Sequence, residues 1–153
     1  MKKRFSLLLI LLSFLPIFSA QATHIVGGEL TLIHQTGNNY IVGLNMYFDA
    51  INGQPGAIDQ TVSISTFSRA TNQLIETFQI PIVSDEFVPY TDPECAVGSL
   101  VTRQIIYALS VELDPNRYKE GAGYYMSWER CCRNEVIDNI INPQSAGQAF
   151  YLE

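Results

Sequence analysis

The sequence predicts an all-β fold, an Ig-like antiparallel β-sandwich of about seven strands with one short helical turn near residues 135–141. Three observations support this prediction. Apolar and polar residues alternate with a period of two along most of the chain. Aromatic and β-branched residues are frequent in the alternating stretches, as is typical of half-buried strands. Glycine, proline and asparagine separate these stretches and supply the backbone conformations that turns need.

Residues 1–22 have the features of a secretory signal peptide. Three cations open the chain, an apolar run follows over residues 7–18, and Ala20-Gln21-Ala22 is a small-x-small cleavage pattern. The apolar run of about twelve residues is shorter than the roughly 20 that a membrane-spanning helix needs. We therefore expect an exported protein with a single mature domain, residues 23–153, and no membrane-spanning segment after signal removal.

The mature chain is acidic. Residues 1–22 contain 3 of the 9 Lys and Arg residues and no acid, so 6 basic residues remain against 15 acidic ones and the net charge is −9. Such a chain repels phosphate backbones and anionic lipid surfaces. The charge therefore argues against a nucleic-acid partner and mainly favours solubility.

A tight hairpin is expected at the start of the mature domain. Strands near residues 28–35 and 40–49 are joined by Gly37-Asn38-Asn39, which tolerates the positive φ angles of a short hairpin turn. A longer loop begins at Asn52-Gly53-Gln54-Pro55-Gly56 and leads to a strand near residues 61–67.

The middle of the chain contains a further strand, an irregular stretch and one long strand. Residues 74–82 alternate after a turn, and Pro81 lies near the predicted end of that strand, where a missing N–H costs least. Residues 84–99 contain two prolines and a glycine, which favour an irregular connection. Residues 101–113 then alternate over their whole length and predict a long half-buried strand.

The C-terminal part predicts a strand, a helical turn and a last short strand. Met126 and Trp128 share one face of the strand at residues 124–129, and we expect that face to be buried. Apolar pairs at residues 136–141 are spaced three and four apart, which favours a helical turn, and residues 148–152 suit a last strand. Because the sequence stops directly after an apolar strand pattern, we expect the domain to be the N-terminal part of a longer protein or a truncated gene product.

The run Ile25-Val26-Gly27-Gly28 matches the activated N-terminus of trypsin-like proteases. Signal cleavage would leave Thr23 and His24 ahead of Ile25, so the free amine would be on the wrong residue. The sequence also lacks the Gly-Asp-Ser-Gly and Ala-Ala-His-Cys stretches that carry the nucleophile and the base of that family. We instead expect an opening strand in which Gly27-Gly28 allows a bulge or a close backbone crossing.

The sequence contains no motif that predicts a metal or a cofactor. His24, His34 and Glu29 fit no compact ligand spacing, and strand alternation places His34 and Glu29 on opposite faces. The acidic loop that contains Asp85 and Asp92 lacks the spacing of a calcium-binding loop. We expect neither a metal site nor a cofactor.

Three cysteines, Cys95, Cys131 and Cys132, enter an oxidising compartment, which favours one disulfide bond. A bond between Cys131 and Cys132 needs strained local geometry because neighbouring strand residues point to opposite faces. Cys95 is therefore expected to pair with Cys132, which continues the face of Trp128, or with Cys131. Neither cysteine has an obvious histidine base, so a catalytic role is disfavoured.

Several short motifs occur together in one order. They are His24–Glu29 (His-Ile-Val-Gly-Gly-Glu), Gly37–Tyr40 (Gly-Asn-Asn-Tyr), Pro93–Cys95 (Pro-Glu-Cys) and Arg130–Asn134 (Arg-Cys-Cys-Arg-Asn), followed by Ile-x-Asn-Ile. With them the mature chain resembles the N-terminal domain of gliding-motility-associated, type IX-secreted surface proteins of Bacteroidota-type bacteria. The resemblance implies a secreted protein on the outer cell surface and no established catalytic role.

This chain departs from that family at three cysteine positions, where it has Gln35, Ala50 and Val101. The resemblance implies that the joint loss at positions 35 and 50 removed a disulfide bond. It also implies that a cysteine at position 101 once paired with Cys131 or Cys132, which would explain the odd thiol.

We expect a non-enzymatic surface module for adhesion, surface assembly or gliding-associated structure, with other surface proteins or extracellular glycans as partners. The alternative is a carbohydrate-binding module that uses exposed tyrosines as a flat stacking platform. The candidates for this platform are Tyr47, Tyr90, Tyr118 and Tyr125. A secreted hydrolase is a further alternative, which the missing motifs disfavour.

Overall fold

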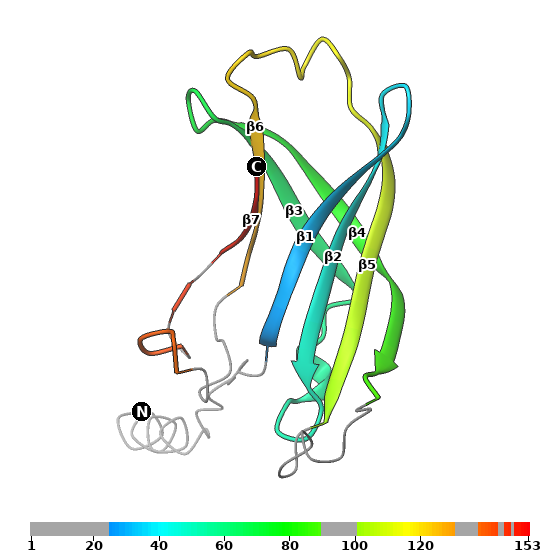
Figure 1. Ribbon diagram of the computed structural model, residues 1–153, viewed down its shortest axis with the longest axis vertical. Coiled ribbons are helices and arrows are strands. Elements are labelled where there is room, and N and C mark those ends of the chain that lie inside the picture. Colours follow the sequence, from blue (N-terminus) through cyan, green and yellow to red (C-terminus); the bar gives the residue numbers. More distant parts are fainter. Residues whose placement is uncertain (1–24, 90–100, 131–137, 144–145, 148) are drawn as a thin grey trace, which may run out of the picture.

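The computed structural model describes residues 25–89, 101–130, 138–143, 146–147 and 149–153. It confirms the predicted all-β fold (Figure 1). The strands are β1 (Ile25–Thr36), β2 (Asn39–Asp49), β3 (Thr61–Ser68), β4 (Leu74–Phe87), β5 (Thr102–Glu112), β6 (Tyr124–Glu129) and β7 (Ala149–Leu152). A short 3-10 helix, η1 (Pro55–Ala57), lies between β2 and β3. No helix among the described residues is long and apolar enough to cross a membrane.

The strands form one antiparallel sheet with the order β1-β2-β5-β4-β3-β6-β7. The sheet folds over, so that β1, β2, β5 and the second half of β4 form one layer and β3, β6 and β7 form the other (Figure 1). This is the ABED and CFG strand arrangement of a constant-type Ig domain. The edge strands β1 and β7 approach each other, which nearly closes the sheet into a barrel.

Strand β4 belongs to both layers. Its first half pairs with β3 up to Pro81, and its second half pairs with β5 from Ile82 to Phe87, with a register shift between Ile82 and Ser84. The prediction that the strand ends at residue 82 and that residues 84–87 are irregular is therefore wrong. Pro81 is tolerated inside the strand because it lies where β4 leaves one partner for the other.

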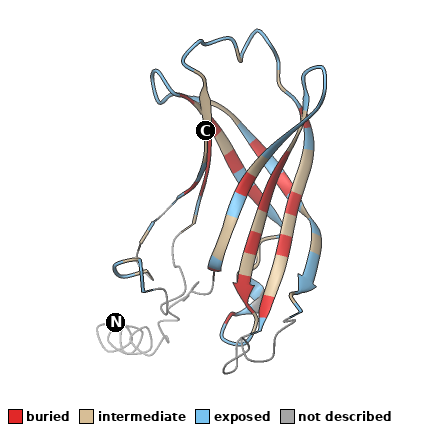
Figure 2. Ribbon diagram, in the orientation of Figure 1, coloured by how far each residue is buried: buried red, intermediate tan, exposed pale blue. Residues whose placement is uncertain are grey.

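The core lies between the two layers and follows the alternation of the sequence (Figure 2). The predicted burial of Met126 and Trp128 is confirmed, and the Trp128 ring lies 5.2 Å from that of Phe150. Strands β2 and β5 supply the opposite wall. Their fully buried apolar and aromatic side chains are Val42, Leu44, Ile105 and Tyr107.

The run at residues 25–28 opens β1, as predicted. Ile25 is buried in the core, and the pairing of β1 with β2 shifts register between Ile25 and Gly27, which marks a bulge. A Cβ at Gly28 would lie 2.5 Å from the carbonyl oxygen of Asn45, whereas one at Gly27 would meet nothing within 4 Å. The two glycines therefore serve the bulge and a close backbone approach.

Part of the predicted helical turn near residues 135–141 falls among the described residues. Residues 138–143 form turns and bends and no helix, and the rest of the predicted helical turn lies outside the described residues.

Gln35 lies beside the β1–β2 hairpin, whereas Ala50 follows the far end of β2, which is 11 residues long. At roughly 3.3 Å per residue these positions are about 36 Å apart, too far for one disulfide bond. A lost bridge between positions 35 and 50 is therefore wrong.

Strand β6 begins with a contact that is typical of Ig-like sandwiches. The Tyr124 hydroxyl donates a hydrogen bond of 3.1 Å to the carbonyl oxygen of Arg117 and accepts one of 2.9 Å from the Glu120 N–H. A tyrosine near the start of the sixth strand that bonds upstream backbone is the tyrosine corner of this fold. It fixes the long β5–β6 loop against β6.

Candidate functional site

The structure separates the tyrosines that were predicted to form a platform. Tyr47 points outward from the layer of β1, β2 and β5, whereas Tyr125 points outward from the layer of β3, β6 and β7. The Tyr47 hydroxyl accepts a hydrogen bond of 3.2 Å from Asn45 and lies in an amide network. Tyr118 lies at one end of the sandwich, between the layers, and Tyr90 lies outside the described residues.

Tyr125 belongs to a row of three rings on the outer face of β3, β6 and β7. Its ring stacks on Phe67 at 5.2 Å with an interplanar angle of 16°, and it lies 5.1 Å from the Tyr151 ring. Phe67 is the direct cross-strand partner of Tyr125, so the register of β3 with β6 brings them together. Because Tyr125 stacks on Phe67 and packs at a tilt against Tyr151, the row forms a ridge of packed rings and not a flat platform.

A groove of about 190 Å³ runs beside this ridge. We call it the outer groove, and it is lined by Ser63, Ser65, Phe67, Ser127 and Glu129. Ser65 shares a hydrogen bond of 2.9 Å with the Thr77 hydroxyl, and Gln79 donates one of 2.9 Å to Ser63. The groove therefore combines one aromatic wall with hydroxyl groups that donate and accept and with one carboxylate.

Charged and polar side chains lie beside Tyr125 and Tyr151 in the ring row. Arg69 forms an ion pair with Glu153, and the Tyr125 hydroxyl donates a hydrogen bond of 3.3 Å to Asn72. Tyr151 is 53% exposed. Desolvation raises the pKa of Tyr151, and the charge of Glu153 raises it further while Arg69 opposes the shift. At neutral pH Tyr151 therefore presents an uncharged phenol group.

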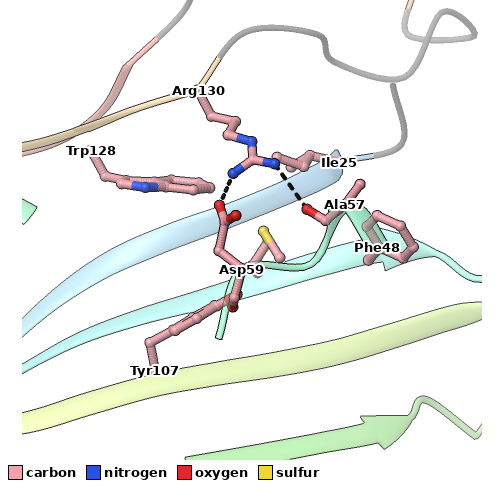
Figure 3. A pocket seen from close by; sticks show the side chains of 8 residues that line it. Ile25, Phe48, Ala57, Asp59, Tyr107, Trp128 and Arg130 are labelled. Carbon is pink, nitrogen blue, oxygen red and sulfur yellow. Dashed lines mark hydrogen bonds and ion pairs between the residues drawn. The ribbon is translucent and has the colours of Figure 1, made fainter. Parts of the chain in front are cut away.

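A second cluster closes the opposite end of the sandwich (Figure 3). Arg130 forms an ion pair with Asp59 and donates a hydrogen bond of 2.9 Å to the carbonyl oxygen of Ala57. The space that Ile25, Phe48 and Trp128 line beneath this cluster measures about 10 Å³. That is room for about one water molecule, so the cluster is a structural clasp and not a ligand site.

Tyr107 supports the clasp from the core. Its side chain is fully buried, and its hydroxyl donates a hydrogen bond of 2.8 Å to the carbonyl oxygen of Asp59. Burial raises the pKa of Tyr107 to about 12, and the charge of Asp85 contributes in the same direction. Asp85 itself lies in β4 and accepts a bidentate pair of hydrogen bonds from Arg103. It does not belong to the acidic loop that was predicted there.

Tyr118 lies at the other end, where the β5–β6 loop covers the sandwich. Its hydroxyl donates a hydrogen bond of 3.3 Å to Glu76, which also pairs with Arg117 at 3.0 Å. Burial raises the pKa of Tyr118, and Glu76 adds to this shift. The Thr66 hydroxyl acts in the opposite direction, although it faces Tyr118 without meeting hydrogen-bond geometry.

The remaining candidate residues do not converge on one site in the described part of the chain. His34 shares a hydrogen bond of 3.0 Å with the Gly37 carbonyl oxygen at the first hairpin. Within the described ranges, no group of three or more His, Cys, Asp or Glu side chains is placed to hold a metal ion. His24 and the three cysteines lie outside the described residues.

Sequence reasoning missed Phe67, Tyr151 and the serines of the outer groove. Strand alternation alone places Tyr125 and Ser127 on the same face, and this signal was available. The partners on β3 and β7 depend on strand order, because the residues that pair with β6 lie 56 to 62 positions upstream on β3 and 20 to 26 positions downstream on β7. Comparisons with protein-family models, curated proteins and solved structures give no match to this chain.

Proposed function

We propose that this chain is an exported, non-enzymatic β-sandwich module that serves adhesion or assembly at the outer cell surface. The signal-peptide pattern of residues 1–22 supports export. The resemblance to gliding-motility-associated surface proteins supports a location on the cell exterior. The single structural observation on which the binding role rests is the outer groove beside the ring row.

Carbohydrate is the ligand class that this groove fits best. A sugar ring has apolar C–H faces and a rim of hydroxyl groups. The outer groove offers Phe67 for the apolar faces and serine hydroxyls with the Glu129 carboxylate for the hydroxyl groups. The groove is shallow and open, which suits a segment of a chain better than an enclosed small molecule. Other surface proteins remain the second class of partner.

A glycan-binding measurement on the mature protein tests this proposal. We expect saturable binding to a subset of glycans on an array, followed by isothermal titration with the best hit. Phe67→Ala and Glu129→Gln should each weaken that binding at least tenfold, because one removes the stacking wall and the other a charged acceptor. Tyr47→Phe is the matched control, since Tyr47 lies on the opposite outer face.

The outcomes separate the two partner classes. An array without hits would reject carbohydrate, and hits that both groove variants retain at full affinity would reject the outer groove as the site. Export is tested separately by protease treatment of intact cells. A mature chain that begins at Thr23 and is removed by the protease supports a surface location, whereas a protected chain with residues 1–22 attached contradicts it.

A further inference from the structure

A larger cavity lies between the two layers, at the end of the sandwich opposite the clasp. We call it the mouth cavity, and its volume is about 390 Å³. It lies beside the β5–β6 loop, which is at the top of Figure 1. Residues from both layers line it, mainly Leu32, Tyr40, Leu113, Met126, Leu152 and Thr66. The volume falls within the range of roughly 300 to 1,000 Å³ that is typical of small-molecule sites.

On β3 the inward side chains become smaller toward the mouth cavity. On β3 the inward positions run from Val62 and Ile64 to Thr66 and Ser68. At the clasp end, by contrast, Trp128 and Phe48 fill the space between the layers. The core is therefore dense at one end of the sandwich and hollow at the other.

Hydrogen bonds hold two rings at the rim of the cavity. The tyrosine corner fixes Tyr124 to the β5–β6 loop, and Tyr118 bonds to Glu76 at 3.3 Å. Rings that are pinned through their hydroxyl groups cannot readily swing inward to fill the space. The mouth cavity is thus a preformed site with mainly apolar and aromatic walls.

One polar group that lines the mouth cavity, the Thr66 hydroxyl, faces Tyr118 but meets hydrogen-bond geometry with no described residue. Thr66 is 1% exposed, and its hydroxyl makes no hydrogen bond in the described part of the structure. A buried hydroxyl without a partner is costly, and a ligand that bonds to it recovers that cost. The described lining includes Glu153, whose carboxylate pairs with Arg69, and no cationic side chain, so it offers no charge partner to an anionic ligand.

We propose that the mouth cavity binds an uncharged, mainly apolar small molecule with one hydrogen-bonding group, which pairs with the Thr66 hydroxyl. The apolar body of the ligand contacts Leu32, Leu113 and Leu152, and the aromatic rim encloses it. This site is separate from the outer groove, so it stands or falls independently of carbohydrate binding.

The test uses N-phenyl-1-naphthylamine, an uncharged fluorescent amine whose N–H suits the Thr66 oxygen. We expect saturable fluorescence enhancement with the mature protein. Leu32→Trp fills the cavity and should weaken probe binding more than tenfold. Ile33→Trp is the matched control, because Ile33 is the next residue on β1, is 52% exposed and does not line the cavity. Thermal melting shows whether each variant folds.

Thr66→Val tests the polar contact, because it keeps the shape of the side chain and removes the hydroxyl. We expect a three- to tenfold loss of probe affinity. Absence of saturable binding to the wild-type protein overturns the proposal, and so does equal binding to the Leu32→Trp and Ile33→Trp variants. Full affinity in Thr66→Val overturns the part assigned to the hydroxyl.

Discussion

The hydroxyl of Tyr107 donates a hydrogen bond of 2.8 Å to the carbonyl oxygen of Asp59, while the side chain of Asp59 pairs with Arg130. One residue of the β2–β3 connection is thereby tied to β5 through its backbone and to the end of β6 through its side chain. Since β5 and β6 belong to different layers, this contact joins the two halves of the sandwich.

Tyr107 predicts a loss of stability at high pH. Its pKa is raised to about 12 in the folded protein, against about 10 when unfolded. Folding therefore favours the neutral phenol, and this contribution is fully present below pH 10 and is lost as the pH rises through 12. The free energy of unfolding should fall by about 2 to 3 kcal/mol between pH 10 and 12 from this residue. Urea unfolding at a series of pH values measures it.

Tyr107→Phe provides the control for this titration. The variant should be less stable at pH 7 by about 1 kcal/mol, because the hydrogen bond to Asp59 is lost. The difference in the free energy of unfolding between wild type and variant should then shrink above pH 10 and reverse sign toward pH 12, because only the wild type loses about 2 to 3 kcal/mol from this titration. A constant gap from pH 8 to pH 12 would contradict the raised pKa of Tyr107.

The clasp predicts a modest coupling between Arg130 and Asp59. Both side chains are partly exposed, so solvent screens the ion pair, and a double-mutant cycle with Arg130→Ala and Asp59→Ala should give about 0.5 to 1 kcal/mol. Arg130→Ala alone should cost more than Asp59→Ala, because it also removes the hydrogen bond to the Ala57 carbonyl oxygen. Equal costs for the two single variants would argue against that bond.

Much of this fold could be predicted from the sequence, because local patterns determine the strands. Alternation identified all seven strands and the buried face of Met126 and Trp128. The errors lie where tertiary pairing overrides local signals. Pro81 favours a strand end, yet β4 continues past it because β5 offers a new partner.

The candidate site was harder to predict than the fold. The outer groove and the mouth cavity depend on which strands become neighbours, and the sequence of one strand does not contain that information. Phe67 meets Tyr125 only because β3 pairs with β6. Thr66 resembles an ordinary polar strand residue in the sequence, and its burial without a partner is visible only in the packed structure.

Neighbouring glycines in β1 provide a matched pair of variants. Gly28→Ala should destabilise the protein by about 1 to 3 kcal/mol, because the new Cβ would lie 2.5 Å from the Asn45 carbonyl oxygen and 3.1 Å from the Phe150 ring. Gly27→Ala should change the free energy of unfolding by less than about 1 kcal/mol, because nothing lies within 4 Å of its Cβ. Similar costs at both positions would contradict the close crossing of β1 and β2.

The cysteines predict one disulfide bond, from Cys95 to Cys132 or to Cys131. Val101 and Arg130 are described residues that lie close to these cysteines in the sequence. Both are at the end of the sandwich that also contains the end of β2 and η1. Peptide mapping of exported protein under non-reducing conditions should therefore find Cys95 in a bridged peptide. Free Cys95 in fully oxidised protein would contradict the prediction.

Two aspartates allow a last comparison between a buried and an exposed turn. The Asp49 carboxylate is buried and accepts hydrogen bonds from the N–H groups of Ile51 and Asn52 at 3.0 and 3.1 Å. Asp114 accepts a similar bond of 2.9 Å from Asn116 on the exposed β5–β6 loop.

Asp49→Ala removes a buried carboxylate together with its hydrogen bonds to the N–H groups of Ile51 and Asn52 and to the Asn52 side chain, whereas water replaces the exposed Asp114 acceptor. Asp49→Ala should therefore cost about 2 to 3 kcal/mol and Asp114→Ala less than about 1 kcal/mol in the free energy of unfolding. Urea unfolding of both variants at pH 7 measures the difference. A cost for Asp114→Ala that equals the cost for Asp49→Ala would mean that burial does not set the strength of these turns.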